Sequence, residues 1–193
     1  MLTAPMKKFL RADNGIAAIE TALILPFLLI LYFGMIDLTA LISFNRKITY
    51  SASVVADLVS QNRTTVLKTT VADYYNAAEL VMAPTPASSV RVEMYGYRKV
   101  AGAVTQIWKT SSGTGPTCST TPDTGAMPAL MTANNDIIVA ITCMDYTPYV
   151  ATFLGDNLIG GTSFNVEQAI MVRPRATTTL TCYQTAVGGA VCS

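Results

Sequence analysis

Histidine is absent from this chain of 193 residues, and charged residues make up only 13% of it, against about a quarter in an average soluble protein. Without histidine the chain lacks the commonest general base, the commonest metal ligand and any Ser-His or Cys-His pair. Triad hydrolysis and zinc chemistry are therefore disfavoured, and an enzyme would need carboxylates, thiols or lysines alone. We predict no enzyme activity, no catalytic residue, no metal site and no cofactor.

Other signatures of ligand chemistry are missing as well. No block of like charge or Lys/Arg stripe is present, which argues against a nucleic-acid partner. Neither a GxxxxGK[ST] loop nor a GxGxxG motif occurs, and the segment from Gly155 to Gly161 is typical of a turn. The run from Asn134 to Asp136 lacks the spacing of a calcium-binding loop and indicates a turn before a strand.

Hydrophobic residues make up 51% of the chain and are concentrated near its N-terminus. The stretch from Thr21 to Ile36 carries no charge, and the apolar sequence continues past Asp37 to Phe44. A helix from Ile16 to Phe44 would be roughly 42 Å long, enough to cross a hydrocarbon core of about 30 Å once. A cleaved secretory signal has a shorter apolar region, of about 7 to 15 residues. The pattern therefore predicts one membrane-spanning helix, with Asp37 as a solvated residue at its far interface.

Basic residues set the expected orientation of this helix. Lys7, Lys8 and Arg11 precede the apolar run, so the positive-inside rule places them in the cytoplasm and the chain from Asn45 onward outside it. We expect residues 1–15 to be a basic leader, residues 16–44 to be the transmembrane helix, and residues 45–193 to form an extracytoplasmic domain.

All four cysteines follow the predicted span, where an oxidising compartment favours disulfides. They contain no CxxC pair, which argues against metal or thioredoxin-type chemistry. Four cysteines allow three connectivities. Among these we favour Cys182 with Cys192 as a local clip and Cys118 with Cys143 across the sheet.

The start of the span contains an unusual charge, Glu20. A charged residue at the centre of a spanning helix costs on the order of 3 kcal/mol on insertion scales, so a carboxylate here calls for a partner unless it stays in water at the interface. Five residues earlier, Gly15 follows a polar stretch suited to a protease at the membrane surface. Cleavage after Gly15 would give Ile16 a free α-amine, which could neutralise Glu20 of a neighbouring subunit and fix the register of assembly.

These residues resemble a known family. The sequence from Gly15 to Glu20 looks like the processing site of type IV pilin-like proteins, and GIAAIETALILPFLLILYFGMIDL looks like the TadE-type segment of the tight-adherence (Tad) pilus system. Further runs are similar to those of TadE- and TadG-like minor pilins: ADLVSQ from Ala56, Ile107-Trp108, DIIVAITCMDYTPYV from Asp136, and VRPR from Val172. The resemblance covers most of the chain and is most specific in residues 15–37.

The resemblance implies cleavage between Gly15 and Ile16 by a membrane prepilin peptidase, followed by assembly with other pilin subunits at an inner-membrane platform. Major Tad pilins are very short and have Tyr after the Glu, whereas Thr21 and a large domain follow Glu20 here. This points to a minor pilin or pseudopilin, stored in the inner membrane in contact with lipid and later displayed on the pilus at the cell surface. The alternative is a permanently anchored periplasmic binding or scaffolding protein that is never processed.

Pro26 lies inside the predicted span. A proline removes one helical hydrogen bond, although membrane helices tolerate such a break. With Gly34 it indicates either a helix that kinks when it moves from bilayer to filament or an ordinary membrane-helix proline.

Beyond the membrane, one helical face is indicated by Ile48, Ala52, Val55 and Val59. A second helix, capped by Thr64, has an apolar face formed by Leu67, Val71, Tyr74, Ala78 and Val81, and ends at Pro84 and Pro86.

A period of two then predicts strands. Val90, Val92 and Met94 share one face, a turn lies near Ala101-Gly102, and a return strand runs from Val104 to Lys109. The segment 110–125 is predicted to be a surface loop, followed by strands over 137–144, 166–172 and 178–183. Trp108, Tyr146 and Tyr149 are interpreted as packing residues rather than a binding patch. The predicted fold class is α+β and type IV pilin-like: a long N-terminal helix packed on an antiparallel sheet.

Overall fold

The computed structural model describes residues 14–63, 65–66, 68–84, 89–125, 127–131, 135–150, 163–175 and 179–182, with the side chains of residues 14–17 and 68–69 left out. The chain divides into two compact units. Unit 1 comprises Met1–Ala40 and Pro148–Thr162, and unit 2 comprises Leu41–Thr147 and Ser163–Ser193.

Helix α2 spans Asn14–Ser60 and supplies most of the described part of unit 1. Of its side chains from residue 18 to 36, all but the half-buried Phe33 are exposed, with Phe27 at 71% and Leu31 at 67%. This helix is long and apolar enough to cross a membrane. Its apolar window is not buried by any part of the chain that the structure describes. The predicted long N-terminal helix is confirmed.

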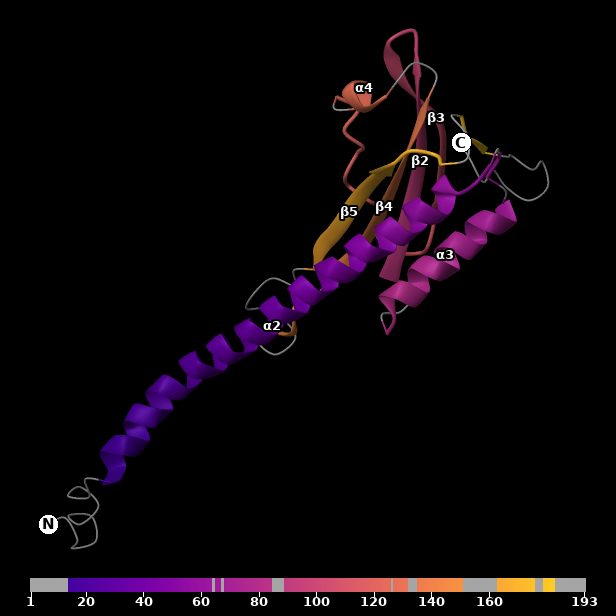
Figure 1. Cartoon of the computed structure of the whole chain (residues 1–193). Coiled ribbons are helices and arrows are strands. Elements are labelled where there is room, and N and C mark those ends of the chain that lie inside the picture. Colours follow the sequence, from indigo (N-terminus) through magenta and orange to yellow (C-terminus); the bar gives the residue numbers. More distant parts are fainter. Residues whose placement is uncertain are drawn as a thin grey trace, which may run out of the picture. The chain divides into compact units, whose positions relative to one another are not determined.

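Unit 2 is built on a four-stranded antiparallel sheet with strand order β3-β2-β4-β5 (Figure 1). Its strands are β2 (Val90–Val100), β3 (Ala103–Ser112), β4 (Asp136–Tyr146) and β5 (Phe164–Val172). Strands β2 and β3 form the predicted hairpin, and both residues of its turn have positive φ, 50° at Ala101 and 88° at Gly102. Such a turn matches the right-handed twist of the strands it joins. Strand β3 extends to Ser112, so the predicted surface loop starts three residues later than expected.

One face of the sheet packs on two helices. Ile48, Val55 and Val59 of α2 contribute to a core that also contains Val92 of β2 and Ile138 of β4. The second helix, α3 (Lys68–Met82), adds Val71, Tyr74, Tyr75, Ala78 and Met82 to this core. The predicted faces of both helices are therefore confirmed, except that Met82 is buried where Val81 was expected. This α+β arrangement of a long helix on an antiparallel sheet is pilin-like, as predicted.

The other face of the sheet, which we call the outer face, is also covered. The sequence did not indicate this cover. Tyr95, Tyr97, Val139 and Ile141 form a second core with Met127 and Met131, which lie in or next to the short helix α4 (Met127–Leu130). The segment 113–131, which includes most of the predicted surface loop 110–125, thus crosses the outer face and buries it through Cys118, Met127 and Met131. Burial on both faces explains why the sequence of β4 is continuously apolar instead of alternating.

The last predicted strand was placed in the wrong sheet. Strand β6 (Thr181–Cys182) does not join the antiparallel sheet; it pairs in parallel with β1 (Thr65–Val66) in a separate two-stranded sheet. The pairing buries Val66 and the neighbouring Leu180 completely. Strand β1 occupies the position where the start of the second helix was expected; Thr64 and Leu67 lie outside the described residues, and α3 begins only at Lys68.

Candidate functional site

The predicted processing site lies at the beginning of the described chain. Gly15 and Ile16 belong to the first turn of α2, and the predicted leader falls, apart from Asn14 and Gly15, outside the described residues. Glu20 is exposed on α2 directly before the charge-free stretch 21–36. The side chain of Glu20 forms no ion pair or hydrogen bond with any residue that the structure describes, so its predicted role in assembly needs a partner from another molecule. The helix continues through Pro26.

Asp37 ends the charge-free stretch, and its contacts correct one expectation. We predicted a solvated residue without a special role. Instead, its carboxylate accepts hydrogen bonds from two backbone N–H groups, that of Tyr149 at 2.6 Å and that of Val150 at 2.8 Å. Tyr149 and Val150 are helical, and the N–H groups of a first helical turn have no partner within their own helix. Asp37 therefore caps a turn that lies 112 residues later in the sequence.

The aromatic residues divide into two groups. Trp108 and Tyr146 are 4% and 7% exposed, which confirms packing for these two. The Trp108 indole also donates from Nε1 to the Leu180 carbonyl at 3.2 Å. Tyr149 is 60% exposed, so the packing interpretation is wrong for it. Its position after the end of β4 leaves it outside the sheet that buries the other two.

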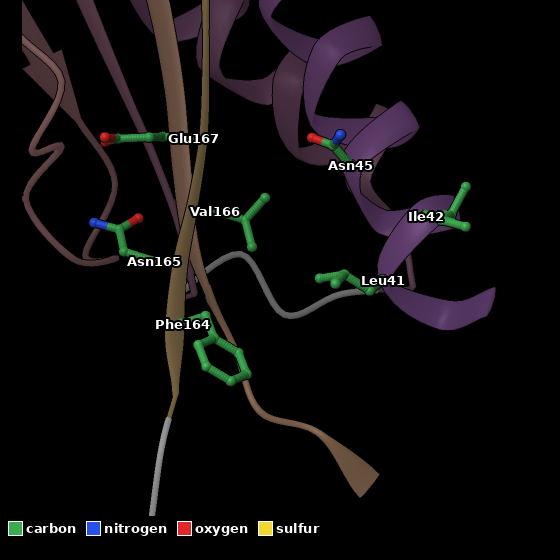
Figure 2. A pocket seen from close by; sticks show the side chains of 7 residues that line it. All are labelled: Leu41, Ile42, Asn45, Phe164, Asn165, Val166 and Glu167. Carbon is green, nitrogen blue, oxygen red and sulfur yellow. The ribbon is translucent and has the colours of Figure 1, made fainter. Parts of the chain in front are cut away.

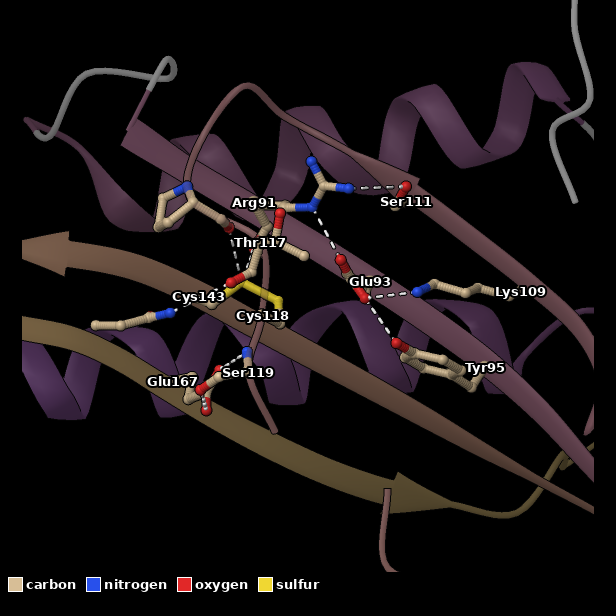
Figure 3. Close-up of polar contacts among 12 residues, drawn as sticks. Arg91, Glu93, Tyr95, Lys109, Ser111, Thr117, Cys118, Ser119, Cys143 and Glu167 are labelled. Atoms are coloured by element: carbon tan, nitrogen blue, oxygen red, sulfur yellow. Dashed lines mark hydrogen bonds and ion pairs between the residues drawn. A yellow bond between two sulfur atoms is a disulfide. The ribbon is translucent and has the colours of Figure 1, made fainter. Parts of the chain in front are cut away.

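A disulfide ties the segment that crosses the outer face to the sheet. Cys118 and Cys143 are joined, which is the pairing favoured from the sequence (Figure 3). Cys182 is also disulfide-bonded, whereas Cys192, its expected partner, lies outside the described residues.

Glu167 of β5 lies beside this disulfide and holds the same segment. Its carboxylate accepts hydrogen bonds from the Ser119 backbone N–H at 2.8 Å, from the Ser119 hydroxyl at 2.6 Å and from the Thr120 hydroxyl. Burial alone raises the pKa of Glu167, but the bonds from Ser119 and Thr120 outweigh it and leave this pKa below its ordinary value. The two sulfur atoms and this carboxylate are close together. Because the sulfurs are bonded to each other, they offer no thiolate to a metal ion.

A buried charge on the same face was missed by the sequence analysis. Glu93 of β2 is 1% exposed, yet its carboxylate contacts Arg91 Nε at 2.9 Å, Lys109 Nζ at 3.1 Å and the Tyr95 hydroxyl at 2.6 Å (Figure 3). Burial raises the pKa of Glu93, and the bonds from Tyr95, Arg91 and Lys109 together lower it below its ordinary value of 4.5. Alternation along β2 predicts that Glu93 and Val92 lie on opposite faces of the sheet. Glu93 is buried because the segment 113–131 covers the outer face, and that cover was not predicted.

Other carboxylates are also used structurally. Asp136 accepts from Arg98 at 2.6 and 2.9 Å and from the Leu180 backbone N–H at 2.5 Å, so its carboxylate holds these two segments at the start of β4. Asp57 of α2 forms an ion pair with Arg175.

One open, mostly apolar groove of about 520 Å³ lies within unit 2 between α2 and β5 (Figure 2). Val166 points from β5 toward the helix, while Asn165 and Glu167 point to the opposite side of the strand. Ile42 and Phe164 are each 48% exposed at this groove. Nothing in the structure shows what covers it, and we assign it no ligand.

Comparison with known proteins identifies a family that matches the N-terminal part of the chain. Residues 15–57 match the family described as TadE-like protein. No curated protein and no solved structure matches the chain. The matched residues begin at Gly15 and include the whole charge-free stretch. The TadE-like family is a structural protein family associated with the Tad pilus, not a family of enzymes. The N-terminal segment 15–57 is thus TadE-like, consistent with a TadE-like protein of the Tad pilus system.

Proposed function

We propose that this chain is a minor pilin or pseudopilin of a Tad-type pilus, which is processed by a prepilin peptidase and then takes part in assembly, initiation or the pilus tip. The observation that carries the proposal is the first half of α2. An exposed apolar helix begins next to Gly15, contains Glu20 as its single early charge, and lies within the segment that is TadE-like.

Before assembly, the proposed location is the inner membrane. The basic residues of the leader favour the cytoplasm for the N-terminus, which puts unit 2 in the periplasm. The Cys118–Cys143 disulfide suits that compartment. After assembly the same domain is displayed on the pilus at the cell surface.

During assembly, α2 exchanges lipid for other pilin helices. Cleavage after Gly15 gives Ile16 a new α-amine, and we propose that Glu20 of a neighbouring subunit neutralises it. Two opposite charges in a low-dielectric helix bundle are far more stable together than either is alone. The partners are therefore the prepilin peptidase, other pilin subunits, the inner-membrane assembly platform and membrane lipid. Nucleic acid and cofactors have no role in this proposal.

Processing is tested by N-terminal sequencing and intact mass of the protein recovered from cells. We expect the mature chain to begin at Ile16, and Gly15→Ala to accumulate the unprocessed form. Gly34→Ala is the matched control, because a Cβ at Gly34 meets no atom within 4 Å and the residue is far from the cleavage site. We expect Gly34→Ala to be processed normally.

Recovery of assembled protein that still carries residues 1–15 would contradict the proposal. It would favour the alternative, a permanently anchored periplasmic binding or scaffolding protein of the pilus machinery. Purified pili that lack this chain, although the chain is processed, would exclude it from the filament as well.

A further inference from the structure

The contact between Asp37 and the turn at Tyr149 ties two distant segments of unit 1 together. Both carboxylate oxygens of Asp37 are used, one by each backbone N–H. Hydrogen bonds to an ionised acceptor are roughly twice as strong as neutral ones. The contact therefore fixes the beginning of the β4–β5 connection to a particular turn of α2.

That turn of α2 lies at one end of the apolar stretch. Sixteen charge-free residues separate Glu20 from Asp37. At about 1.5 Å per residue the two carboxylates are roughly 25 Å apart along the helix, close to the thickness of a hydrocarbon core. When this helix spans a bilayer, Asp37 comes to the periplasmic interface, and the turn that it caps comes with it.

The described residues of this turn suit the surface of a membrane. Tyr149 is 60% exposed, and tyrosine is enriched at the level of lipid headgroups because its ring is apolar and its hydroxyl is polar. The connection between β4 and β5 carries one charged residue, Asp156, in its sequence from Thr147 to Ser163. Few charges and an exposed aromatic ring favour contact with lipid over water.

We propose that the turn at Tyr149 is a second membrane contact of this protein, held by Asp37 on the periplasmic surface of the bilayer. Its ligand is the lipid interface itself, with the Tyr149 ring among the headgroups. The proposal rests on the proposed function in one respect, since it requires α2 to span the membrane. It adds that unit 1 touches the bilayer through a second segment, which is distant in sequence from the helix.

The test measures the depth of a tryptophan at this position in the full-length protein. Trp108 is the only native tryptophan and is 4% exposed in the core of unit 2, so the unaltered chain supplies the background signal. Tyr149→Trp is reconstituted in vesicles of phosphatidylcholine and phosphatidylglycerol whose acyl chains carry bromine near the headgroup or near the bilayer centre. We expect the shallow bromines to remove about half or more of the added emission, and the deep bromines much less, because aromatic rings of this class lie at headgroup level.

Tyr32→Trp is the positive control in the same helix. Tyr32 is 62% exposed inside the apolar stretch and lies only about 5 Å from its midpoint along the helix, so we expect the deep bromines to quench a tryptophan there more than the shallow ones. If position 32 is not quenched, α2 does not span the bilayer and the proposed function fails. If position 32 is quenched and position 149 is not, only the second membrane contact is overturned. This holds whether the side chain at position 149 is exposed to water or covered by a second molecule of this chain.

The role of Asp37 is tested in the Tyr149→Trp background. Asp37→Ala removes both acceptors, and we expect the shallow quenching at position 149 to fall to the background. Thr39→Ala is the matched control, because it removes a hydroxyl that donates to the Met35 carbonyl on the same part of the helix. We expect Thr39→Ala to leave the quenching unchanged. Undiminished quenching in Asp37→Ala would overturn the proposal that Asp37 holds the turn.

Discussion

At the scale of single residues, Glu93 is the side chain whose chemistry depends most on its surroundings. The folded protein lowers its pKa below 4.5, since the bonds from Tyr95, Arg91 and Lys109 outweigh the effect of burial. The carboxylate therefore stabilises the fold fully above about pH 4.5, and this contribution is lost as the pH falls through the lowered pKa.

Glu93→Gln tests this contribution. The variant leaves two cations near a neutral amide, and we expect its free energy of unfolding at pH 7 to be about 3 kcal/mol lower than that of the unaltered chain. The difference should shrink as the pH falls below 4.5, because the unaltered glutamate is then neutralised too. Denaturant titrations followed by Trp108 fluorescence, at pH 7 and below pH 4.5, measure the difference in free energy of unfolding between the two proteins. A difference that does not change with pH would contradict the ion pairs.

A matched control is available in α3. Glu79 is half-buried and lies on the helix rather than in the sheet. We expect Glu79→Gln to change the free energy of unfolding by less than about 0.5 kcal/mol at any pH in this range, as is usual for substitutions away from buried networks.

Gly96 is required by close packing against Trp108. A Cβ at position 96 would lie 2.2 Å from Trp108 Nε1, well inside the contact distance of two atoms. Because the indole is fixed by its bond to the Leu180 carbonyl, it cannot move without loss of that bond. We expect Gly96→Ala to lower the free energy of unfolding by about 3 kcal/mol and to shift the Trp108 emission to longer wavelength. An unchanged spectrum would mean that the indole does not lie over Gly96.

At the scale of elements, the segment 113–131 depends on its attachments to the sheet. The disulfide closes a loop with a sequence separation of 25, which corresponds to about 3.5 kcal/mol of stabilisation in the chain-entropy description. We expect the double variant Cys118→Ser/Cys143→Ser to lose about this much and to become sensitive to protease between residues 113 and 125. Limited proteolysis and denaturant unfolding provide the measurements.

Serine at the buried position 143 would also introduce a hydroxyl into the core. The pair Cys118→Ala/Cys143→Ala separates the two effects, since it removes the linkage without that hydroxyl. Equal losses in the two double variants would assign the stabilisation to the linkage, and no loss in the alanine pair would contradict it.

Local periodicity in the sequence was sufficient to predict the helices and strands that line the core between α2, α3 and the sheet. The spacing of Ile48, Val55 and Val59 was sufficient to identify the buried side of α2, and the alternation along β2 was sufficient for the hairpin. The same patterns could not place β6, because Thr181 and Cys182 form too short a strand to show a period, and their partner β1 is 116 residues away. The cover of the outer face was missed for a similar reason, since Met127 and Met131 lie between the predicted loop 110–125 and the strand predicted from residue 137, in a stretch too short to show a period.

The candidate site likewise contains a part that the sequence reveals and a contact that it does not. Gly15, Glu20 and the apolar stretch form a continuous sequence pattern, so they could be recognised without a structure. The cap that Asp37 provides could not, because it joins residues 112 positions apart through backbone atoms that leave no trace in the sequence. A charge at the end of an apolar run was the only signal, and it is equally typical of a residue in water.

At the scale of the whole molecule, the proposed processing would change the charge of the protein. Residues 1–15 contain three of the 13 basic residues and one of the 12 acidic ones, so their removal would change the formal net charge from +1 to −1. The sequence pI of about 7.6 is then that of a basic leader combined with a slightly acidic subunit.

Assembly itself depends, in this proposal, on one carboxylate at the start of α2. Glu20→Ala should leave membrane insertion and processing intact, because it only makes the helix more apolar. We expect at least about a tenfold loss of this chain from purified pili, since an uncompensated Ile16 α-amine in a helix bundle costs well over 1.4 kcal/mol. Glu79→Ala, which removes a glutamate from α3, is the control and should assemble normally. Quantitative immunoblots of membrane and pilus fractions compare the variants, and undiminished incorporation of Glu20→Ala would leave the charge pair without a role.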